Sequence, residues 1–447
     1  MRMHASVPRP ASLLVPLALA LGLAACEASL AGTGDGDETG TDGTSEGDGD
    51  PGDGDMDGDA GDGDMGDGDT LDDLPAPELP EALLDYDPDL PAHFRTAFVD
   101  GMDNTPADNP ITNAGATLGR VLFWDRRLSQ NGAVSCGSCH RPELGFSDEL
   151  EQSEGFAGDH TRRNSMSLIN LRWYEREAMF WDERAATLED QVLMPIQDEA
   201  EMGLTLEELV ARVEDADYYA PLFEAAFGTP DVSEERIAAA MAQFVRSIVS
   251  YQSRWDAGVT AVAGDIALDF PNFSDAENRG KRIFFGQHDP DTRGLCGTCH
   301  LQANPLSFAP PGPGPTPVFD NTAVFFQIAP SNNGLLDDDD DGVGETTGID
   351  QDLGKFKVSS LRNVALTGPY MHDGRFATLE EVVAHYNDGV QAHPNLDPAL
   401  REIGPGGGPL RLDLDAGDQA ALVAFMRTLT DETLASDERW SDPFPRD

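Results

Sequence analysis

The sequence predicts a mostly α-helical protein with long loops and little strand, folded as two domains. Three observations support this prediction. Apolar residues recur at helical spacing, several times just after a Ser or Thr that can cap a helix. Stretches rich in Gly and Pro, notably 304–320 and 403–409, separate these segments, and alternating strand patterns are few. One five-residue motif also occurs twice, far apart in the chain.

The helical segments can be placed in order along the chain. Three capping boxes mark helix starts: Thr205 with Glu208, Ser274 with Glu277, and Thr378 with Glu381. Apolar residues at helical spacing follow the first box, at 206, 209, 210 and 213, and a separate apolar stripe consists of Ile237, Met241, Phe244, Ile248 and Tyr251. A last helix is predicted at about 418–429. In a capping box the two side chains satisfy backbone N–H groups at the first turn. Most of these stripes are therefore expected to form the core.

The repeated motif is Cys-x-x-Cys-His. Its two thiols can bond to the vinyl groups of one haem, and the adjacent His can ligate the iron. Half of a zinc site or a redox-active cysteine pair are alternatives for a single copy, but two copies favour haem. We therefore expect two covalently bound haem c groups, one in each of two cytochrome c-like domains. Their predicted ligands are Cys136, Cys139 and His140, and Cys296, Cys299 and His300.

The N-terminus has the pattern of a secretion signal. Residues 11–25 form an apolar run that is too short for a stable membrane span, and small residues precede Cys26. This end of the run resembles a bacterial lipobox. We expect residues 1–25 to be a signal peptide and Cys26 to anchor a lipoprotein on the periplasmic side of the bacterial cell envelope. An ordinary secretory signal is the alternative, and the sequence does not choose between the inner and outer membrane.

A strongly acidic segment follows the predicted anchor. Gly and Asp dominate residues 31–70, and residues 27–94 contain no Lys or Arg, in a chain with a net charge of −53. Such a composition favours disorder, so residues 26–94 are predicted to be a solvated linker, with calcium loading of the Asp repeats as a lesser alternative. The charge argues against nucleic acid as a partner and favours a basic redox protein.

Several short motifs in the rest of the chain resemble the bacterial dihaem cytochrome c peroxidases, a family that includes MauG. They are LFWDRRLS (122–129), RNS (163–165), FWDER (180–184), Gln191 with Pro195 and Glu201, FKV (356–358), LRN (361–363) and LTGPYMHDG (366–374). The resemblance covers roughly residues 95–432. It implies a peroxide-reacting haem in residues 95–265 and an electron-transfer haem in residues 266–447.

The resemblance also implies an activity and partners. The first expectation is reduction of hydrogen peroxide to water with electrons from a small redox protein, either a cytochrome c or a cupredoxin. A MauG-like oxidation of residues in a partner protein is the alternative, and a non-catalytic electron carrier is a third possibility. Many relatives form dimers, so a homodimer is also a candidate.

Around the first haem, the family positions imply three functional side chains. Glu201 would move protons between the peroxide oxygens, Gln191 would line the same pocket, and Trp181 would lie between the haems. His160 is a candidate distal ligand, with a surface histidine as the alternative.

Around the second haem, the family position of the distal ligand holds Tyr386, where the ordinary peroxidases have Met and MauG has Tyr. Met371, the adjacent His385 and an open iron are the alternatives. A phenolate favours ferric iron, whereas a thioether raises the reduction potential. Asn164, Thr367 and Pro369 match the positions that supply oxygens to an interdomain Ca²⁺. The run Asp337–Asp341 is a weaker calcium candidate, because it lacks the terminal bidentate acid of an EF-hand loop.

Overall fold

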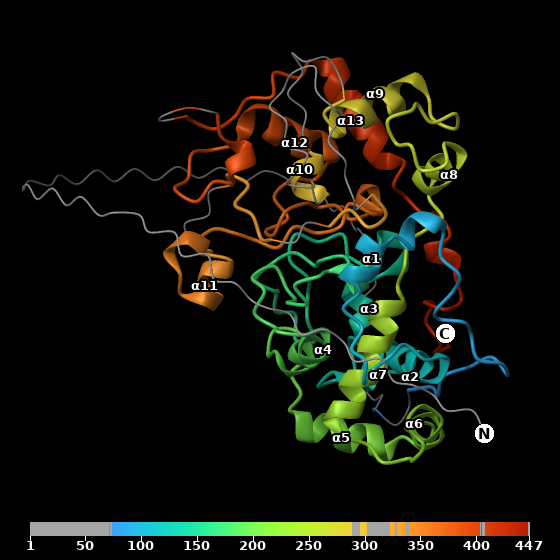
Figure 1. Cartoon of the computed structure of the whole chain (residues 1–447). Coiled ribbons are helices and arrows are strands. Elements are labelled where there is room, and N and C mark those ends of the chain that lie inside the picture. Colours follow the sequence, from blue (N-terminus) through green and yellow to red (C-terminus); the bar gives the residue numbers. More distant parts are fainter. Residues whose placement is uncertain are drawn as a thin grey trace, which may run out of the picture. The chain divides into compact units, whose positions relative to one another are not determined.

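The computed structural model describes residues 71, 74–287, 296–301, 322–326, 329–335, 339–402, 404 and 407–445. The signal segment, Cys26, most of the predicted linker and the loop 304–320 lie outside these residues. The α-helices labelled in Figure 1 are α1 (Ala97–Met102), α2 (Asn113–Trp124), α3 (Cys136–Cys139), α4 (Leu188–Gln197), α5 (Leu206–Asp215), α6 (Tyr219–Phe227), α7 (Glu234–Ser247), α8 (Arg254–Ala261), α9 (Asp275–Phe284), α10 (Gly297–His300), α11 (Val343–Thr347), α12 (Leu379–Ala384) and α13 (Ala416–Arg427). Strand pairing among the described residues is limited to isolated bridges. The predicted mostly helical fold is confirmed.

The local helix signals are confirmed where they can be checked. Thr205, Ser274 and Thr378 each accept a hydrogen bond from the backbone N–H three residues on, and each is part of a complete capping box. The last predicted helix, at about 418–429, is α13, which begins two residues earlier. These starts were predictable because a capping box involves only neighbours in the sequence.

Each half of the described chain contains one close helix pair. In the first half α2 packs against α7, and in the second half α9 packs against α13 (Figure 1). Both pairs need a glycine at the crossing. A Cβ on Gly119 would lie 2.0 Å from the carbonyl oxygen of Ala240, and a Cβ on Gly280 would lie 1.9 Å from that of Ala421. Because the Cys-x-x-Cys-His motif falls between the two helices of each pair, the halves repeat one arrangement.

The buried apolar residues form two clusters. The first cluster extends to Val249, and the second begins at Trp255, where the indole stacks 5.6 Å from Phe285. The chain therefore passes from the first core to the second between Val249 and Trp255, before the predicted domain boundary at 265. Two later segments return to the first cluster, through Ala323, Val324 and Phe326 and then through Leu434 and Trp440. The chain after Trp255 therefore does not belong to the second core alone.

The predicted linker ends earlier than residue 94. Tyr86 and Phe94 are almost completely buried in the first core, and the backbone N–H of Glu78 donates to the carbonyl of Pro443. The prediction of a disordered linker is therefore wrong for residues 74–94. Unlike the Gly/Asp-rich segment before it, this stretch has apolar and aromatic side chains that the core can bury.

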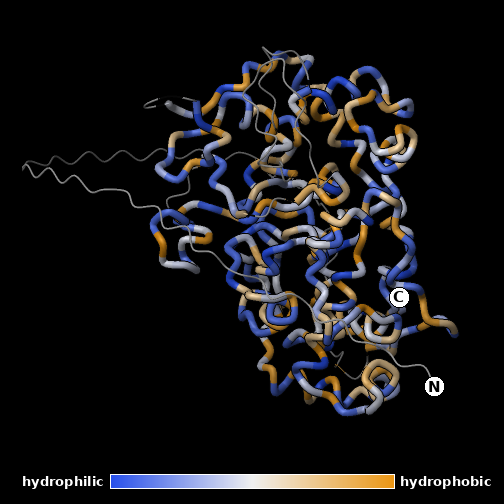
Figure 2. Tube along the Cα trace, in the orientation of Figure 1, coloured by the Kyte–Doolittle hydropathy of each residue, from blue (hydrophilic) through white to orange (hydrophobic). Residues whose placement is uncertain are grey.

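None of the described helices is both long enough and apolar enough to cross a membrane. Figure 2 shows polar residues interspersed with apolar ones along the trace of both halves. This pattern is the one expected of helices that bury one face against a core.

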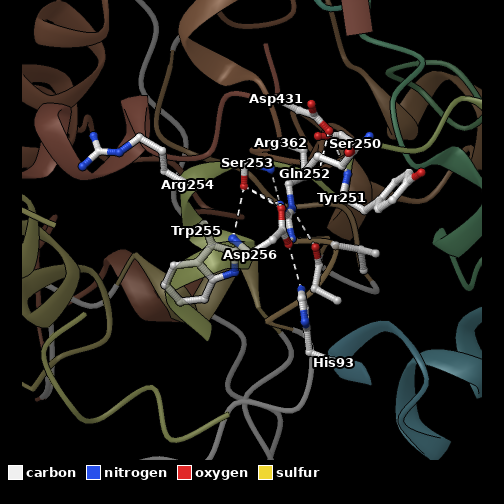
Figure 3. Close-up of polar contacts among 12 residues, drawn as sticks. His93, Ser250, Tyr251, Gln252, Ser253, Arg254, Trp255, Asp256, Arg362 and Asp431 are labelled. Carbon is white, nitrogen blue, oxygen red and sulfur yellow. Dashed lines mark hydrogen bonds and ion pairs between the residues drawn. The ribbon is translucent and has the colours of Figure 1, made fainter. Parts of the chain in front are cut away.

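A buried ion-pair network lies where the two cores meet (Figure 3). The guanidinium of Arg362 donates to both carboxylate oxygens of Asp256, at 2.7 and 2.8 Å, and the imidazole of His93 is 2.7 Å from Asp256 Oδ1. Arg362 also lies over the rings of Phe94 in the first cluster and Phe325 in the second. The network thus ties the N-terminal segment to α8 and to the loop that carries Arg362.

Candidate functional site: two cavities built on the Cys-x-x-Cys-His motifs

The first motif forms the short helix α3 at the edge of a cavity of about 60 Å³. Cys136, Cys139 and His140 line this cavity. Ser135 caps the helix through a box with Ser138. Burial raises the pKa of both thiols to about 12 and lowers the pKa of His140. The set of two half-buried thiols and one neutral imidazole at a cavity wall fits a covalently attached haem.

The ring orientation of His140 is fixed by the backbone. Its Nδ1 lies 2.9 Å from the carbonyl oxygen of Phe146, so this nitrogen carries the proton and donates it. The Nε2 atom is then unprotonated and free to ligate an iron. A hydrogen bond of this kind is the usual way in which a protein selects the tautomer of a metal-binding histidine.

Glu201, Gln191 and Pro195 line the same cavity as the first motif. Gln191 and Pro195 are four residues apart on α4, which places them on one face of the helix. Glu201 lies in the turn after α4, where its carbonyl accepts from the N–H of Phe156. The structure brings these predicted residues together.

The carboxyl group of Glu201 has an unusually high pKa for a glutamate. Burial, and then the charge of Asp198, raise the pKa of Glu201 to about 7, while Arg184 acts in the opposite direction. A carboxyl group with a pKa near neutrality can both accept and donate a proton at working pH. Its position in the cavity and its ionisation therefore agree with an acid–base role.

His160 is placed away from the cavity. The side chain is exposed, and its Nδ1 lies 3.3 Å from the carbonyl oxygen of Gln152. Its neighbours Glu154 and Thr161 line the cavity, but His160 does not. The geometry favours a surface histidine, because the antiparallel bridge between Glu154 and His160 holds this segment as a loop on the exterior.

The second motif includes α10 and lines a larger cavity, of about 230 Å³. Cys296, Cys299 and His300 are at its wall, and burial lowers the pKa of His300 to about 4. Most of the other lining residues are apolar, including Phe284, Leu361, Val383, Leu414 and Met426. A large apolar pocket with two thiols and a neutral imidazole fits a second haem.

Tyr386 and Met371 both line the second cavity, whereas His385 does not. Tyr386 follows α12 in a single π-helical turn, His385–Gly389. The Nε2 atom of His385 lies 3.1 Å from the carbonyl oxygen of Asn333, so this ring forms a hydrogen bond with the backbone and does not face the cavity. Asn333 also places its side-chain amide 3.5 Å from the sulfur of Met371. The geometry retains Tyr386 and Met371 as candidate ligands and disfavours His385.

Trp181 comes from the first half of the chain but lines the second cavity. Its indole Nε1 donates to the carbonyl oxygen of Asn164 at 2.9 Å, and its own carbonyl accepts from the N–H of Lys357 at 2.8 Å. Trp181 is therefore held from both halves of the chain. Trp181 lines the second cavity but not the first, so its predicted place between the two haems stays a prediction.

The three predicted calcium residues, Asn164, Thr367 and Pro369, also line the second cavity. The backbone N–H of Asn164 donates to the carbonyl of His372, which joins the two segments directly. Of the weaker candidate run, residues 337 and 338 lie outside the described residues, and Asp340 is bound by Arg163 at 2.7 and 2.8 Å. Among the described residues no group of three or more His, Cys, Asp or Glu side chains forms a metal site.

Sequence reasoning gave no role to two charged residues beside these cavities. Arg163 donates to Asp340 and, at 2.6 Å, to Asp182, and so connects the halves next to Trp181. Lys357 is 2 % exposed and lines the second cavity. Both residues belong to motifs that carry the family resemblance, so the sequence could have pointed to them. Their contacts could not be predicted, because their partners are far away in the sequence.

Comparison with known proteins agrees with this geometry. A family model described as di-haem cytochrome c peroxidase matches residues 113–263. The chain is 32% identical over 346 residues to methylamine utilization protein MauG of Methylorubrum extorquens, across 74% of this chain and 82% of that protein. It is 30% identical over 315 residues to cytochrome c551 peroxidase of Nitrosomonas europaea, across 70% of this chain and 79% of that protein.

Solved structures show the same relationship. A MauG-like protein associated with microbial copper homeostasis has 32% identity and a TM-score of 0.60, and the match covers 82% of this chain and 99% of that one. The diheme peroxidase BthA from Burkholderia thailandensis has the same fold at 24% identity and a TM-score of 0.54, over 73% of this chain and 88% of that one. Together with the two attachment motifs and their cavities, these similarities show that the chain belongs to the di-haem cytochrome c peroxidase and MauG family.

Proposed function

We propose that the protein is a dihaem peroxidase that reduces hydrogen peroxide to water with electrons from a small redox protein. The observation that carries this proposal is the placement of Glu201, with its pKa of about 7, in the cavity of the first attachment motif. An electron carrier has no need of a titratable acid beside its iron, whereas peroxide cleavage requires a proton to be moved.

When bound, the first haem supplies the iron at which peroxide is reduced. The residues of the chain hold the iron, move the proton and orient the peroxide at this site. His140 presents its Nε2 because Phe146 holds the Nδ1 proton. Glu201 in its ionised form takes the proton from one peroxide oxygen and delivers it to the other, which leaves as water. Gln191, which lines the same cavity, orients the peroxide for this transfer.

The test is peroxide turnover by the holoprotein carrying Glu201→Gln. The amide cannot accept the proton, so we expect kcat/KM for peroxide to fall roughly 100-fold or more. Glu199→Gln is the matched control, because Glu199 is exposed on the same turn and lines neither cavity. Equal activity of the Glu201 and Glu199 variants would remove Glu201 from the mechanism.

A MauG-like reaction is the second candidate, and Tyr386 is the observation that favours it. Tyr386 lines the second cavity together with His300, the predicted iron ligand of the second motif. A phenol in this position would bind ferric iron as a phenolate and oppose its reduction. The second centre would then hold an oxidising equivalent for use on a partner protein. Peroxide added to the fully oxidised protein, with mass spectrometry of added candidate proteins, separates this reaction from simple peroxide reduction.

The electron donor is proposed to be a basic cytochrome c or cupredoxin. A chain with a net charge of −53 attracts a cationic partner, and salt screens that attraction. The KM for a basic cytochrome is therefore expected to rise with ionic strength. A KM that does not respond to salt would contradict charge-guided docking. A homodimer, as in many relatives, is proposed as the assembled form and is tested by light scattering of the holoprotein.

The location of the protein is proposed from its N-terminal sequence alone. Residues 1–25 are a signal peptide in this proposal, and a lipid on Cys26 holds the enzyme to the bacterial cell envelope on the periplasmic side. Mass spectrometry of the mature N-terminus tests it. A thioether-linked lipid on Cys26 is expected, and an unmodified Cys26 or cleavage elsewhere would contradict the anchor.

One Ca²⁺ is proposed between the halves of the chain, held by oxygens of Asn164, Thr367 and Pro369. These residues all line the second cavity, and amide and carbonyl oxygens suit a hard cation. Elemental analysis of the purified holoprotein is expected to find one calcium per chain, and fewer in Asn164→Ala. Equal calcium content in the two proteins would contradict this site.

A further inference from the structure

A buried tyrosine lies beside the second cavity with a proton acceptor already in contact. Tyr174 is fully buried, and its hydroxyl donates a short hydrogen bond to Glu183 Oε1. Arg176 holds the same carboxylate through three contacts of 2.6 to 3.1 Å. The carboxylate is therefore fixed in place to receive the phenolic proton.

Lys357 connects this pair to the cavity. Its ammonium nitrogen lies 3.7 Å from the centre of the Tyr174 ring, and it also contacts the carbonyl oxygen of Ala178 and the sulfur of Met179. Lys357 is one of the residues that line the second cavity. Tyr174 is thus separated from that cavity by a single side chain.

The same turn that presents Trp181 also presents Glu183. The bridge between Met179 and Ala185 closes the turn, and Phe180 and Glu183 both have positive φ, at 70° and 55°. Residues other than glycine rarely adopt this backbone conformation, and it persists only where the surroundings enforce it. The strained turn directs Trp181 to the cavity and Glu183 to Tyr174.

A second tyrosine–carboxylate pair elsewhere in the chain provides a contrast. Tyr219 is also buried, and its hydroxyl donates to Asp125 at 2.8 Å. Tyr219 and Asp125 line neither cavity. The chemistry of the two pairs is similar, and only Tyr174 has a contact with a residue that lines the second cavity.

From this arrangement we propose that Tyr174 is a redox-active residue that gives one electron to the peroxide-oxidised enzyme while Glu183 takes its phenolic proton. The inference rests on the proposed peroxide reaction. One hydrogen peroxide accepts two electrons and two protons to give two waters. Tyr174 supplies one of the electrons, and the haem centres, when bound, would supply the other. Both protons that complete the two waters come from the solvent, because the phenolic proton stays on Glu183. The products at the pair are a neutral tyrosyl radical and a protonated Glu183.

The first test needs no variant. The holoprotein is mixed with one equivalent of hydrogen peroxide, frozen within milliseconds to seconds and examined by EPR. We expect an organic-radical signal that becomes narrower when the protein is made with ring-deuterated tyrosine. Peroxide consumption without any tyrosine signal would overturn the inference but leave the proposed peroxidase function standing. No peroxide consumption at all would instead count against the proposed function.

Two variants then assign the radical. Tyr174→Phe removes only the hydroxyl group and is expected to abolish the tyrosine signal, whereas Tyr219→Phe is expected to keep it. A signal that survives Tyr174→Phe, or that is lost equally in Tyr219→Phe, would overturn the assignment. Haem absorption and thermal unfolding establish that each variant is folded.

The role of Glu183 is tested by Glu183→Gln, which preserves a hydrogen bond but is a poor proton acceptor. The radical is expected to form more slowly in this variant, and its formation in the unmodified protein is expected to be slower in D₂O. If Glu183 has only a structural role, Glu183→Gln should destabilise the protein and leave the rate of radical formation unchanged. That outcome would limit the role of the carboxylate to packing.

Discussion

The two haem-attachment sites of this chain have the same five-residue motif but different surroundings. The first cavity, of about 60 Å³, contains a titratable carboxyl group and an amide, Glu201 and Gln191. The second cavity, of about 230 Å³, is mostly apolar and contains Tyr386, Met371 and an indole from the other half of the chain. The covalent attachment therefore does not determine what each site does. The other side chains that line each cavity suit the first cavity to proton transfer and the second to holding or passing electrons.

The largest expected effect concerns the framework that the two sites share. Arg362→Met would leave the buried carboxylate of Asp256 without its cationic partner, which costs about 3–5 kcal/mol in comparable buried pairs. Because Arg362 contacts both cores, we expect the free energy of unfolding to fall for the whole protein, in one transition. Denaturant unfolding followed at both haems measures this. Separate transitions for the two haems would show that the halves unfold independently.

The same pair gives the stability a defined pH dependence. Burial alone would raise the pKa of Asp256, but the charge of Arg362 and hydrogen bonds from His93, Arg362 and Ser253 outweigh it and hold the pKa well below the ordinary value. The stabilisation is thus complete above the unfolded pKa of about 4 and is lost as the pH falls below it. Arg362→Met is expected to lose most of this acid sensitivity.

A smaller effect is expected from exchanging the distal side chain of the second site. Tyr386→Met replaces a hard oxygen donor by a thioether, so the reduction potential of the second haem should rise by on the order of 0.1 V. Met371→Leu is the matched control and should leave the potential unchanged. Spectroelectrochemical titration measures both proteins. If Met371→Leu shifts the potential and Tyr386→Met does not, Met371 is the ligand.

The first site should differ from the second in its response to pH. Burial and Asp198 raise the pKa of Glu201 to about 7, and the ionised form is the proton acceptor. In unmodified protein kcat/KM for peroxide should therefore rise about tenfold per pH unit below pH 7 and level off above it. Glu201→Gln should lack this limb. A limb that remains in the variant would belong to another group.

The parts of this comparison that could be predicted from the sequence are the local ones. The attachment motifs and the capping boxes at Thr205 and Ser274 depend on residues a few positions apart. The contacts of Arg163 with Asp340 and of Lys357 with Tyr174 join residues that are far apart in the chain, and only the folded structure brings them together. Residues 74–94 were mispredicted for a related reason, since their apolar side chains are ordered by a core formed elsewhere.

The smallest expected effect is at His160, and it decides whether the first site is open in the oxidised protein. The side chain is exposed and does not line the cavity, so His160→Ala should leave the absorption and EPR spectra of the oxidised protein unchanged. Peroxide should also react with the fully oxidised protein before and after the substitution. If the variant instead changes the ferric spectrum and begins to react without prior reduction, His160 closes the first haem. The first site would then be gated by reduction of the second, and the two sites would differ in access as well as in chemistry.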